Sequence, residues 1–233
     1  MSTLNEISYR ILNKLEVSIS DDSDIDLREI ESEVDKKRAL YLRQELNKNR
    51  SIDENVKQDL GCVELELADR ADCCDITVDC SILRTKYELP KPIELNFGNP
   101  LWVGPVDKLN FPFSLVTYEA AKYVGNGRFN SNMIFAFWLN RRIYLISKND
   151  AHKLLSHINV RGVFEKPSEA AIFTNCATGQ SCYTKDTQYP VNEWMLNLIE
   201  SEVYNEFLSK LKNPIDNSND ANNDKLPQGN PVK

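Results

Sequence analysis

The chain has 233 residues, of which 41% are hydrophobic and 27% are charged, as in an ordinary globular protein of one large or two small domains. Its formal net charge of −7 and pI of about 5.0 argue against sequence-independent DNA binding, which needs a basic surface. The longest apolar run, residues 133–139, is too short to cross a bilayer, and the first residues lack the pattern of a signal peptide. We therefore expect a protein that matures in a cytoplasm with its six cysteines reduced.

Two helices are predicted at the start of the chain, joined into a hairpin by the acidic loop 20–24. The first helix covers residues 3–19, where apolar residues return at the spacing of one helical face: Leu4, Ile7, Ile11 and Leu15. The second covers residues 25–49, a segment that neither Gly nor Pro interrupts. Its apolar face comprises Leu27, Ile30, Val34, Tyr41 and Leu42.

Two charged residues, Arg38 and Glu45, fall within the apolar face of the long helix. For an isolated monomer we expect both side chains to lay their stems along the edge of the core and to keep their charges in water. The alternative is that this face also contacts a second partner, such as a neighbouring copy of the chain. Under that alternative, reversing the charge of Arg38 disturbs assembly more than folding.

Acidic residues precede the long helix. Asp22, Ser23 and Asp24 are good N-caps, and Asp26 adds negative charge at the positive end of the helix dipole. The alternating aspartates also match the beginning of a calcium-binding loop. However, the glycine and the later glutamate of an EF-hand are missing at the required spacing. We therefore interpret these residues as a helix cap.

A short third helix is predicted between Ser51, its N-cap, and Gly61, its stop signal, with Glu54 in the capping-box position. The pattern changes at residue 62, because apolar and acidic residues then alternate strictly. This alternation predicts a half-buried strand. Its buried face is expected to comprise Val63, Leu65 and Leu67.

The centre of the chain is predicted to form a mainly antiparallel sheet. Individual strands are expected at residues 81–89, 93–97, 101–109 and 157–164. The strongest signal is a hairpin of 133–139 with 143–147, turning at Asn140 and Arg141. Residues 111–129 are expected to form a loop that contains one helical turn near 118–123.

The last helix is predicted over residues 191–211, after a short helix that begins at Pro167 and a loop at 174–189. One apolar face is expected to comprise Trp194, Leu198, Val203 and Leu208, and a second stripe Met195, Ile199 and Phe207. Pro214 ends the helix, and residues 213–233 are rich in Asn and Asp, with too few apolar residues for a core. This tail is either frayed or an arm that becomes ordered on a partner.

The predicted fold class is α+β. An N-terminal helical hairpin and a returning C-terminal helix form a small bundle, into which a mainly antiparallel β domain is inserted. The expected domains are residues 1–60 with 190–212 for the bundle, 61–189 for the insertion, and 213–233 for a flexible arm.

Few residues indicate catalysis. The two histidines, His152 and His157, lack the spacing of an HExxH metal site, and no P-loop, GxGxxG or GxSxG motif is present. Residues 125–128 (GNGR) come nearest to a phosphate-binding loop, but no long helix follows them, so a turn is expected. We expect no enzymatic activity and no cofactor.

The cysteines are the most specific chemical feature. The candidates for a tetrahedral zinc site are Cys73, Cys80, Cys176 and Cys182. Two distant loops would have to meet, and neither pair has the CxxC spacing of a zinc knuckle. The simpler expectation is that Cys62 and at least one of Cys73 and Cys74 are small buried apolar residues. A catalytic cysteine paired with a histidine is a further alternative, although nothing marks a base or an oxyanion site.

Several segments are informative when taken together. They are LREIESEVDKKRALYLRQELNKNRSIDENVKQDLGCVELE, DRADCCDITVDCSILRTK, VGPVDKLNFPFSLV, GNGRF, RGVFEKPSEAA, and the C-terminal helix followed by NPIDNSND. Over residues 25–220 this set resembles the structural ring proteins of crAss-like and related short-tailed phages of Bacteroidota. The order of helices and strands also resembles, more loosely, head-to-tail adaptors such as tail tubular protein A.

The resemblance implies a virion protein that forms a ring in the neck between portal and tail, typically of about twelve copies. Such a ring connects the portal to the tail and lines a channel through which packaged DNA passes without specific binding, to which an acidic balance is suited. It would assemble in the cytoplasm of the host bacterium, without a membrane partner. The hairpin at 3–49 and the helix at 191–211 would contact neighbouring copies, and residues 213–233 would reach a neighbour or the portal. The candidate interface residues are Arg38, Tyr41, Leu42, Glu45, Trp194, Pro214 and Asp216.

Two alternatives belong to other functional classes. The first is a zinc-stabilised, phage-encoded binding module without a virion role, which metal analysis of the purified protein would detect. The second is a small cysteine-dependent hydrolase, which predicts that alkylation of one cysteine abolishes an activity.

Overall fold

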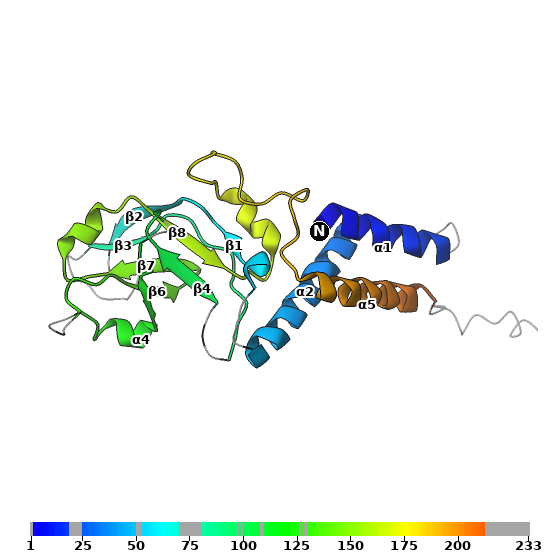
Figure 1. Cartoon of the computed structure of the whole chain (residues 1–233), viewed down its shortest axis with the longest axis horizontal. Helices are drawn as coiled ribbons and strands as arrows, with labels where there is room; N and C mark the ends of the chain where they lie inside the picture. The colour runs from blue at the N-terminus through cyan, green and yellow to red at the C-terminus, as the bar shows by residue number, and fades with distance from the viewer. Residues whose placement is uncertain are drawn as a thin grey trace, which may run out of the picture.

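The computed structural model describes residues 2–18, 25–49, 53–69, 81–96, 98, 100–107, 110–125, 127 and 130–212. A helical bundle and a strand-rich body lie next to each other along the long axis of the molecule (Figure 1). The α+β class predicted from the sequence is confirmed. No helix within these ranges has the length and apolar character that crossing a membrane requires.

Three helices form the bundle, and their apolar faces share one core. They are α1 (Leu4–Ser18), α2 (Leu27–Asn49) and α5 (Glu193–Lys212). The fully buried core residues include Ile7, Ile11, Leu15, Ile30, Val34, Met195, Ile199 and Val203. These positions return every three or four residues, so the helical periodicity of the sequence also describes the packing. The predictions of an N-terminal hairpin and a returning C-terminal helix are confirmed.

Side-chain caps begin both helices of the hairpin. The N–H of Glu6 donates to Thr3 Oγ1 at 3.2 Å, and the N–H of Thr3 donates to Glu6 Oε2 at 3.1 Å, which is a capping box. The N–H of Arg28 donates to Asp26 Oδ1 at 2.9 Å at the start of α2. The predicted caps at residues 22–24, and with them most of the proposed calcium loop, lie outside the described residues.

The predicted third helix is wrong in extent. Only a single 3-10 turn forms, η1 (Glu54–Val56), with Asp53 as its N-cap, whereas Ser51 lies outside the described residues. The chain then extends into β1 (Gln58–Asp59), which pairs with β8 (His157–Gly162). Pairing with the sheet satisfies the backbone groups that a longer helix would have used.

Among the described residues, the strand-rich body is one sheet of eight strands. In addition to β1 and β8, the strands are β2 (Val63–Asp69), β3 (Ser81–Thr85), β4 (Leu101–Gly104), β5 (Ser114–Val116), β6 (Phe135–Leu139) and β7 (Arg142–Ile146). Strand β8 pairs with β1, β2 and β4, and the sheet continues in the order β2-β3-β7-β6-β5. Every pair is antiparallel except β5 with β6, so the prediction of a mainly antiparallel sheet is confirmed.

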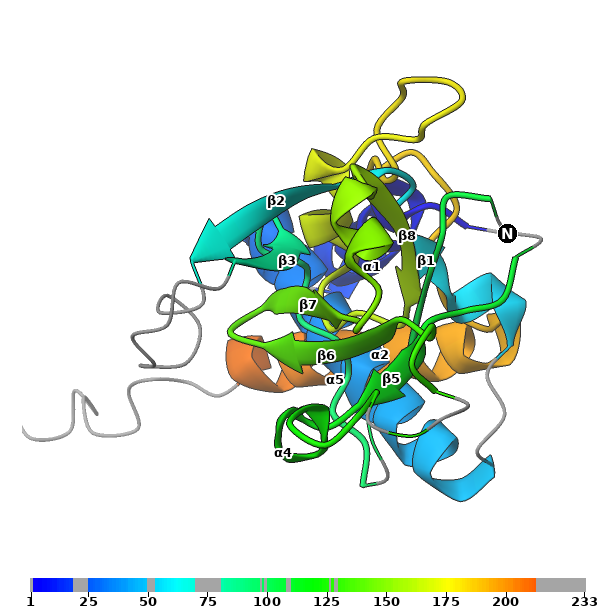
Figure 2. The same cartoon turned by 90° about the vertical axis from the view of Figure 1, so that its left-hand side faces the viewer.

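The sheet curls until its two ends approach each other (Figure 2). The N–H of Phe113, just before β5, donates to the carbonyl oxygen of Val103 in β4 at 2.8 Å. Apolar side chains fill the interior, among them Val63, Leu83, Val103, Ala136, Leu145, Ile158 and Val160. Because the curled sheet brings its edge strands together, little unpaired backbone is left open to solvent at this point.

The β6–β7 hairpin forms where the sequence predicts it. Asn140 and Arg141 have φ of 49° and 59°, as a two-residue type I′ turn requires. Arg141 is held in this conformation because its Nε donates to the carbonyl oxygen of Leu89 at 3.1 Å and its guanidinium pairs with Glu169. The hairpin prediction is confirmed.

Short helical turns complete the described chain. They are α4 (Tyr118–Ala121), η2 (Asp150–Leu154) and η3 (Pro167–Ile172). The predicted helical turn near 118–123 and the short helix that begins at Pro167 are confirmed, although the latter is a 3-10 helix.

Three expectations about the sheet are wrong: one strand position, one loop position and one buried residue. The described residues of 93–97 form no strand, apart from an isolated bridge between Leu95 and Gly98, and Leu95 packs against the bundle instead. Residues 114–116, expected as loop, form β5, because β6 offers its edge to them. Leu67, expected in the core, is 55% exposed because it lies past the interior cluster of the sheet.

Candidate assembly surfaces

Arg38 joins the bundle to the strand-rich body. It lies in the middle of α2 and is 0% exposed. Its Nε donates to the carbonyl oxygen of Pro190 at 2.7 Å, and its Nη1 donates to that of Phe164 at 2.8 Å. The guanidinium also lies over the ring of Tyr189, 5.6 Å from the centroid. One side chain therefore holds together α2, the segment after β8 and the segment before α5.

Asp35 and Tyr189 complete this junction. The hydroxyl of Tyr189 donates to Asp35 Oδ1 at 2.7 Å. Burial raises the pKa of the Asp35 carboxyl, although the hydrogen bond from Tyr189 and the charge of Arg38 act in the opposite direction. Burial also raises the pKa of Tyr189 well above its ordinary value, and lowers that of Arg38. Because a guanidinium stays protonated in proteins, the junction contains a buried cation whose contacts belong to its own chain.

The expectation that Arg38 keeps its charge in water is therefore wrong. Its partners are backbone carbonyls of the same chain, so reversing its charge is now expected to disturb folding first. Leu42 is also inside the chain, in the bundle core, and the hydroxyl of Tyr41 donates to Glu202 on α5. Glu45 is partly exposed. A role for these α2 residues between copies stays a prediction, and it fits Tyr41 and Glu45 better than the two buried residues.

The free energy of unfolding should fall as the pH rises above about 10, the ordinary pKa of tyrosine. Tyr189 must keep its proton to donate to Asp35, and its pKa is higher in the folded chain than in the unfolded chain. Between these two pKa values the folded chain binds more protons, so its stability is complete below the lower value and is lost as the pH rises through the higher one. Urea unfolding followed at increasing pH measures this slope. Tyr189→Phe should make the slope smaller without removing it, because the pKa values of Tyr41 and Tyr183 are also raised. An equal slope in that variant would contradict the assignment.

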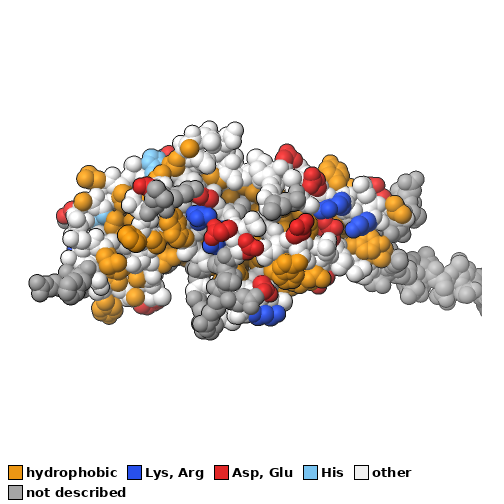
Figure 3. Space-filling view, in the orientation of Figure 1, with side chains coloured by type: hydrophobic (Ala, Val, Ile, Leu, Met, Phe, Trp, Pro, Cys, Tyr) orange, Lys and Arg blue, Asp and Glu red, His pale blue; other side chains and the backbone are white. Residues whose placement is uncertain are grey.

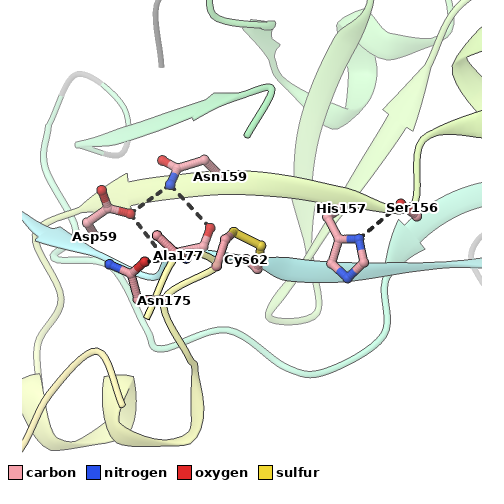
Figure 4. The surroundings of a disulfide bond; sticks show 9 residues. Asp59, Cys62, Ser156, His157, Asn159, Asn175 and Ala177 are labelled. Atoms are coloured by element: carbon pink, nitrogen blue, oxygen red, sulfur yellow. Dashed lines mark hydrogen bonds between the residues drawn. A yellow bond between two sulfur atoms is a disulfide. The ribbon is translucent and has the colours of Figure 1, made fainter. Parts of the chain in front are cut away.

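Cys62 and Cys176 form a disulfide, with their Cα atoms 5.1 Å apart (Figure 4). It ties the start of β2 to a loop 114 residues later in the chain. The N–H of Cys62 donates to the carbonyl oxygen of Thr174 at 3.1 Å, so the covalent bond reinforces a backbone contact. The expectations that all cysteines are reduced and that Cys62 is a buried apolar residue are wrong, because the fold brings these two residues together.

The chain around the disulfide is fixed by polar contacts (Figure 4). The amide of Asn159 on β8 donates to Asp59 Oδ1 at 2.7 Å and to the carbonyl oxygen of Gly61 at 3.2 Å. Gly61 has a φ of 63°, and a Cβ there would lie 2.6 Å from the carbonyl oxygen of Thr174. The predicted helix stop is thus wrong: Gly61 permits the close approach that the disulfide bridges.

The zinc hypothesis loses one of its four ligands. Cys176 is bound to Cys62, and Cys73 and Cys80 lie outside the described residues. Cys182 is partly buried and packs against the interior of the sheet. Within the ranges that the structure describes, no group of three or more His, Cys, Asp or Glu side chains is placed to hold a metal ion.

Residues 174–182, which we call the stapled loop, project from the body above the disulfide (Figures 1 and 2). Thr174 and Ser181 form a β-bridge at the base. The N–H of Asn175 donates to the carbonyl oxygen of Gln180 at 2.9 Å, and the N–H of Gly179 donates to that of Asn175 at 2.8 Å. Gly179 has a φ of 66°, as the return of the chain requires. Internal hydrogen bonds and one covalent bond therefore define the conformation of this loop.

Helix α5 is only half buried. Met195, Ile199 and Phe207 face the bundle core, which confirms the second predicted stripe. Trp194 and Leu198, predicted on a packed face, are 54% and 44% exposed, because α1 and α2 cover the opposite side of the helix. We call the exposed residues of this side the α5 face: Trp194, Asn197, Leu198, Ser201 and Asn205. The remaining predicted interface residues, Pro214 and Asp216, lie outside the described residues.

A groove of about 640 Å³ lies between α1 and α5 beside this face. Val17, which is 90% exposed, and Tyr204 contribute its apolar lining. Glu200 is nearly buried in it and pairs with Arg10 at 2.7 Å and with Lys14 at 3.6 Å. Figure 3 shows hydrophobic side chains at the surface of both the bundle and the strand-rich body. Exposed apolar surface of this kind is typical of proteins that bind other proteins.

The histidines lie in separate local contacts. The Nδ1 of His152 is 2.7 Å from the carbonyl oxygen of Asn149, and the Nδ1 of His157 is 2.9 Å from Ser156 Oγ. Gly125 has a φ of 79°, as expected for a turn, whereas residues 126 and 128 of the GNGR segment lie outside the described residues. These contacts fix each side chain within its own segment.

Comparison with known proteins gives two findings. The family model described as phage tail ring protein 2 matches residues 6–225. Ring protein 2 of Bacteroides phage crAss001 is 26% identical over 227 residues, which cover 95% of this chain and 97% of that protein. Both matches extend across the bundle and the strand-rich body.

Proposed function

Because the chain belongs to the phage tail ring protein 2 family, we propose that it is a non-enzymatic subunit that closes into a ring connecting the portal to the tail. The observation that carries the proposal is the extent of the family match, residues 6–225. The family is one of structural ring proteins of the phage tail, which places the chain in the virion as part of an oligomeric assembly.

Three details belong to the same proposal. The ring contains about twelve copies, because rings stacked on a portal tend to match its symmetry. It lines the channel for packaged DNA, and the net charge of −7 favours the passage of DNA without binding. The ring assembles in the cytoplasm of the host bacterium, and its neighbours are the portal and other tail proteins.

Native mass spectrometry and negative-stain images of the full chain test this proposal, alone and after mixing with the portal and tail proteins of the same phage. Rings in either sample would support it, and their mass would give the number of copies. A chain that stays monomeric in every mixture, and is missing from purified tails, would contradict it.

Ending the chain after Lys212 should leave the melting temperature unchanged and reduce incorporation into virions. Residues 213–233 contain few apolar side chains, so they add little to any core, whereas an arm that orders on a partner would be lost. Thermal unfolding and quantitative immunoblots of purified virions measure the two effects. Normal incorporation of the shortened chain would contradict the role of the arm.

A further inference from the structure

We propose that neighbouring copies contact each other head to tail, with the stapled loop of one copy packed against the α5 face of the next. This inference rests on the ring proposed above and names the two surfaces that build it. Failure of this contact and failure of the ring itself give different experimental outcomes.

The stapled loop belongs to an unusually uncharged part of the chain. Residues 170–184 contain no Asp, Glu, Lys or Arg, although 27% of the whole chain is charged. Residues 174–181 are all exposed, and Ile172 beside them is 70% exposed. A polar surface without charges loses less hydration energy than a charged one when a partner covers it, and the centres of protein interfaces are depleted of charged residues.

The α5 face is uncharged in the same way. All five exposed residues between Trp194 and Asn205 lack a charge. Over the whole of each helix, among the residues that the structure describes, two of the eight exposed residues of α5 are charged (Glu193 and Lys210), compared with four of seven on α1 and five of eight on α2. Helix α5 therefore carries the fewest exposed charges of the three, which indicates that it is the side that a partner covers.

The stapled loop is ready to bind without further ordering. The Cys62–Cys176 disulfide, the Thr174–Ser181 bridge and the hydrogen bond from Gly179 to Asn175 already define its shape. A loop held in its bound conformation avoids much of the entropy cost of association. A disulfide at the base of an exposed loop has this effect whether or not the loop contributes to the core.

The two surfaces lie on different parts of the molecule. Figure 1 shows the stapled loop at the top of the chain and α5 at the lower right, where it starts beside α2 and runs away from the strand-rich body. Two different surfaces that meet between copies give a heterologous contact, which repeats from copy to copy and forms a ring when the rotation closes. The ring proposed above requires such a contact, so a second copy of this chain is the partner to which the proposal commits. On the α5 face, Trp194 is 54% exposed and supplies an aromatic anchor.

Matched aspartate substitutions in the full chain test this contact. Leu198→Asp is compared with Leu40→Asp on α2, since the two leucines are 44% and 48% exposed. Thr178→Asp in the stapled loop is compared with Ser32→Asp, because both residues are exposed. We expect Leu198→Asp and Thr178→Asp each to weaken ring formation about 100-fold, whereas the two controls keep it. Sedimentation velocity and negative-stain images measure assembly, and thermal unfolding verifies that all four variants remain folded.

Mixing the variants tests the direction of the contact. The Leu198→Asp copy has an intact stapled loop and the Thr178→Asp copy has an intact α5 face, so an equal mixture should give dimers and no rings. Combining Thr178→Asp with Ser201→Lys in one chain should restore part of the assembly through opposite charges. Rings from either single variant as readily as from the unsubstituted chain would overturn this contact and leave the ring itself intact. If the unsubstituted chain forms no ring, alone or with its tail proteins, the proposed function fails first.

Discussion

Replacing Arg38 with methionine should lower the free energy of unfolding by about 3 kcal/mol, because two buried carbonyl oxygens lose their donors at about 1–3 kcal/mol each. Methionine fills a similar volume, so lost hydrogen bonds rather than a cavity dominate the change. The two carbonyl oxygens belong to Pro190, in the segment before α5, and to Phe164, in the segment after β8. Urea unfolding measures the effect, with Lys36→Met on the exposed side of the same helix as the control.

Two further substitutions separate charge from geometry at this junction. Arg38→Lys keeps the charge but has no rigid fork to reach two carbonyl oxygens. We therefore expect its free energy of unfolding to lie between those of the unsubstituted chain and of Arg38→Met. Arg38→Glu places a carboxylate against carbonyl oxygens and Asp35, and we expect it not to fold. A methionine variant as stable as the unsubstituted chain would show that Arg38 does not hold the bundle and the strand-rich body together.

Removal of the Cys62–Cys176 disulfide should cost about 4 kcal/mol, because cross-links that close loops of roughly 100 residues restrict the unfolded chain by this amount. Cys62→Ser combined with Cys176→Ser removes the bond without leaving a reactive thiol. Thermal unfolding of this variant should match that of the unsubstituted chain in the presence of a reductant.

Cys182→Ser is the matched control, because Cys182 lies in the stapled loop but outside the disulfide. It should change the melting temperature only slightly, and its unfolding should still respond to the reductant. An unsubstituted chain whose melting temperature is the same with and without reductant would contradict a stabilising disulfide.

The sequence predicts those elements that local pattern determines. Helices α1, α2 and α5 follow from apolar periodicity, and the β6–β7 hairpin follows from two apolar runs around Asn140 and Arg141. The ring-protein resemblance is also confirmed by the family match over residues 6–225.

Elements that depend on distant partners are missed. The stretch 114–116 becomes a strand only because β6 lies beside it, and Ile93 and Leu95 pack against the bundle core instead of joining the sheet. Arg38 is buried because carbonyl oxygens 126 and 152 residues later in the chain receive its donors. No spacing rule reveals such acceptors, since every residue has a carbonyl group.

The candidate surfaces divide in the same way. A contact role for Trp194 stays a prediction, and only the structure shows that Trp194 is exposed together with uncharged neighbours. The stapled loop gives one signal in the sequence, its lack of charge, whereas the pairing of Cys176 with Cys62 requires the fold. Spacing alone cannot distinguish a disulfide from a metal site when the two cysteines are far apart.

The position of the disulfide has a mechanical consequence. Cys62 and Cys176 enclose strands β2 to β8, whereas α1 and α5, which lead to the two ends of the chain, lie outside the covalent loop. Tension applied between the ends therefore bypasses the chain between the two cysteines. It acts on the bundle, on β1 and on the segments that join them to the disulfide. At about 3.4 Å per extended residue, the disulfide keeps roughly 390 Å of chain from being extended. A stretched subunit therefore reaches a much shorter length than a chain of 233 residues without the bond. Under such tension the subunit yields at its helices and at β1, while the strands inside the covalent loop keep their shape.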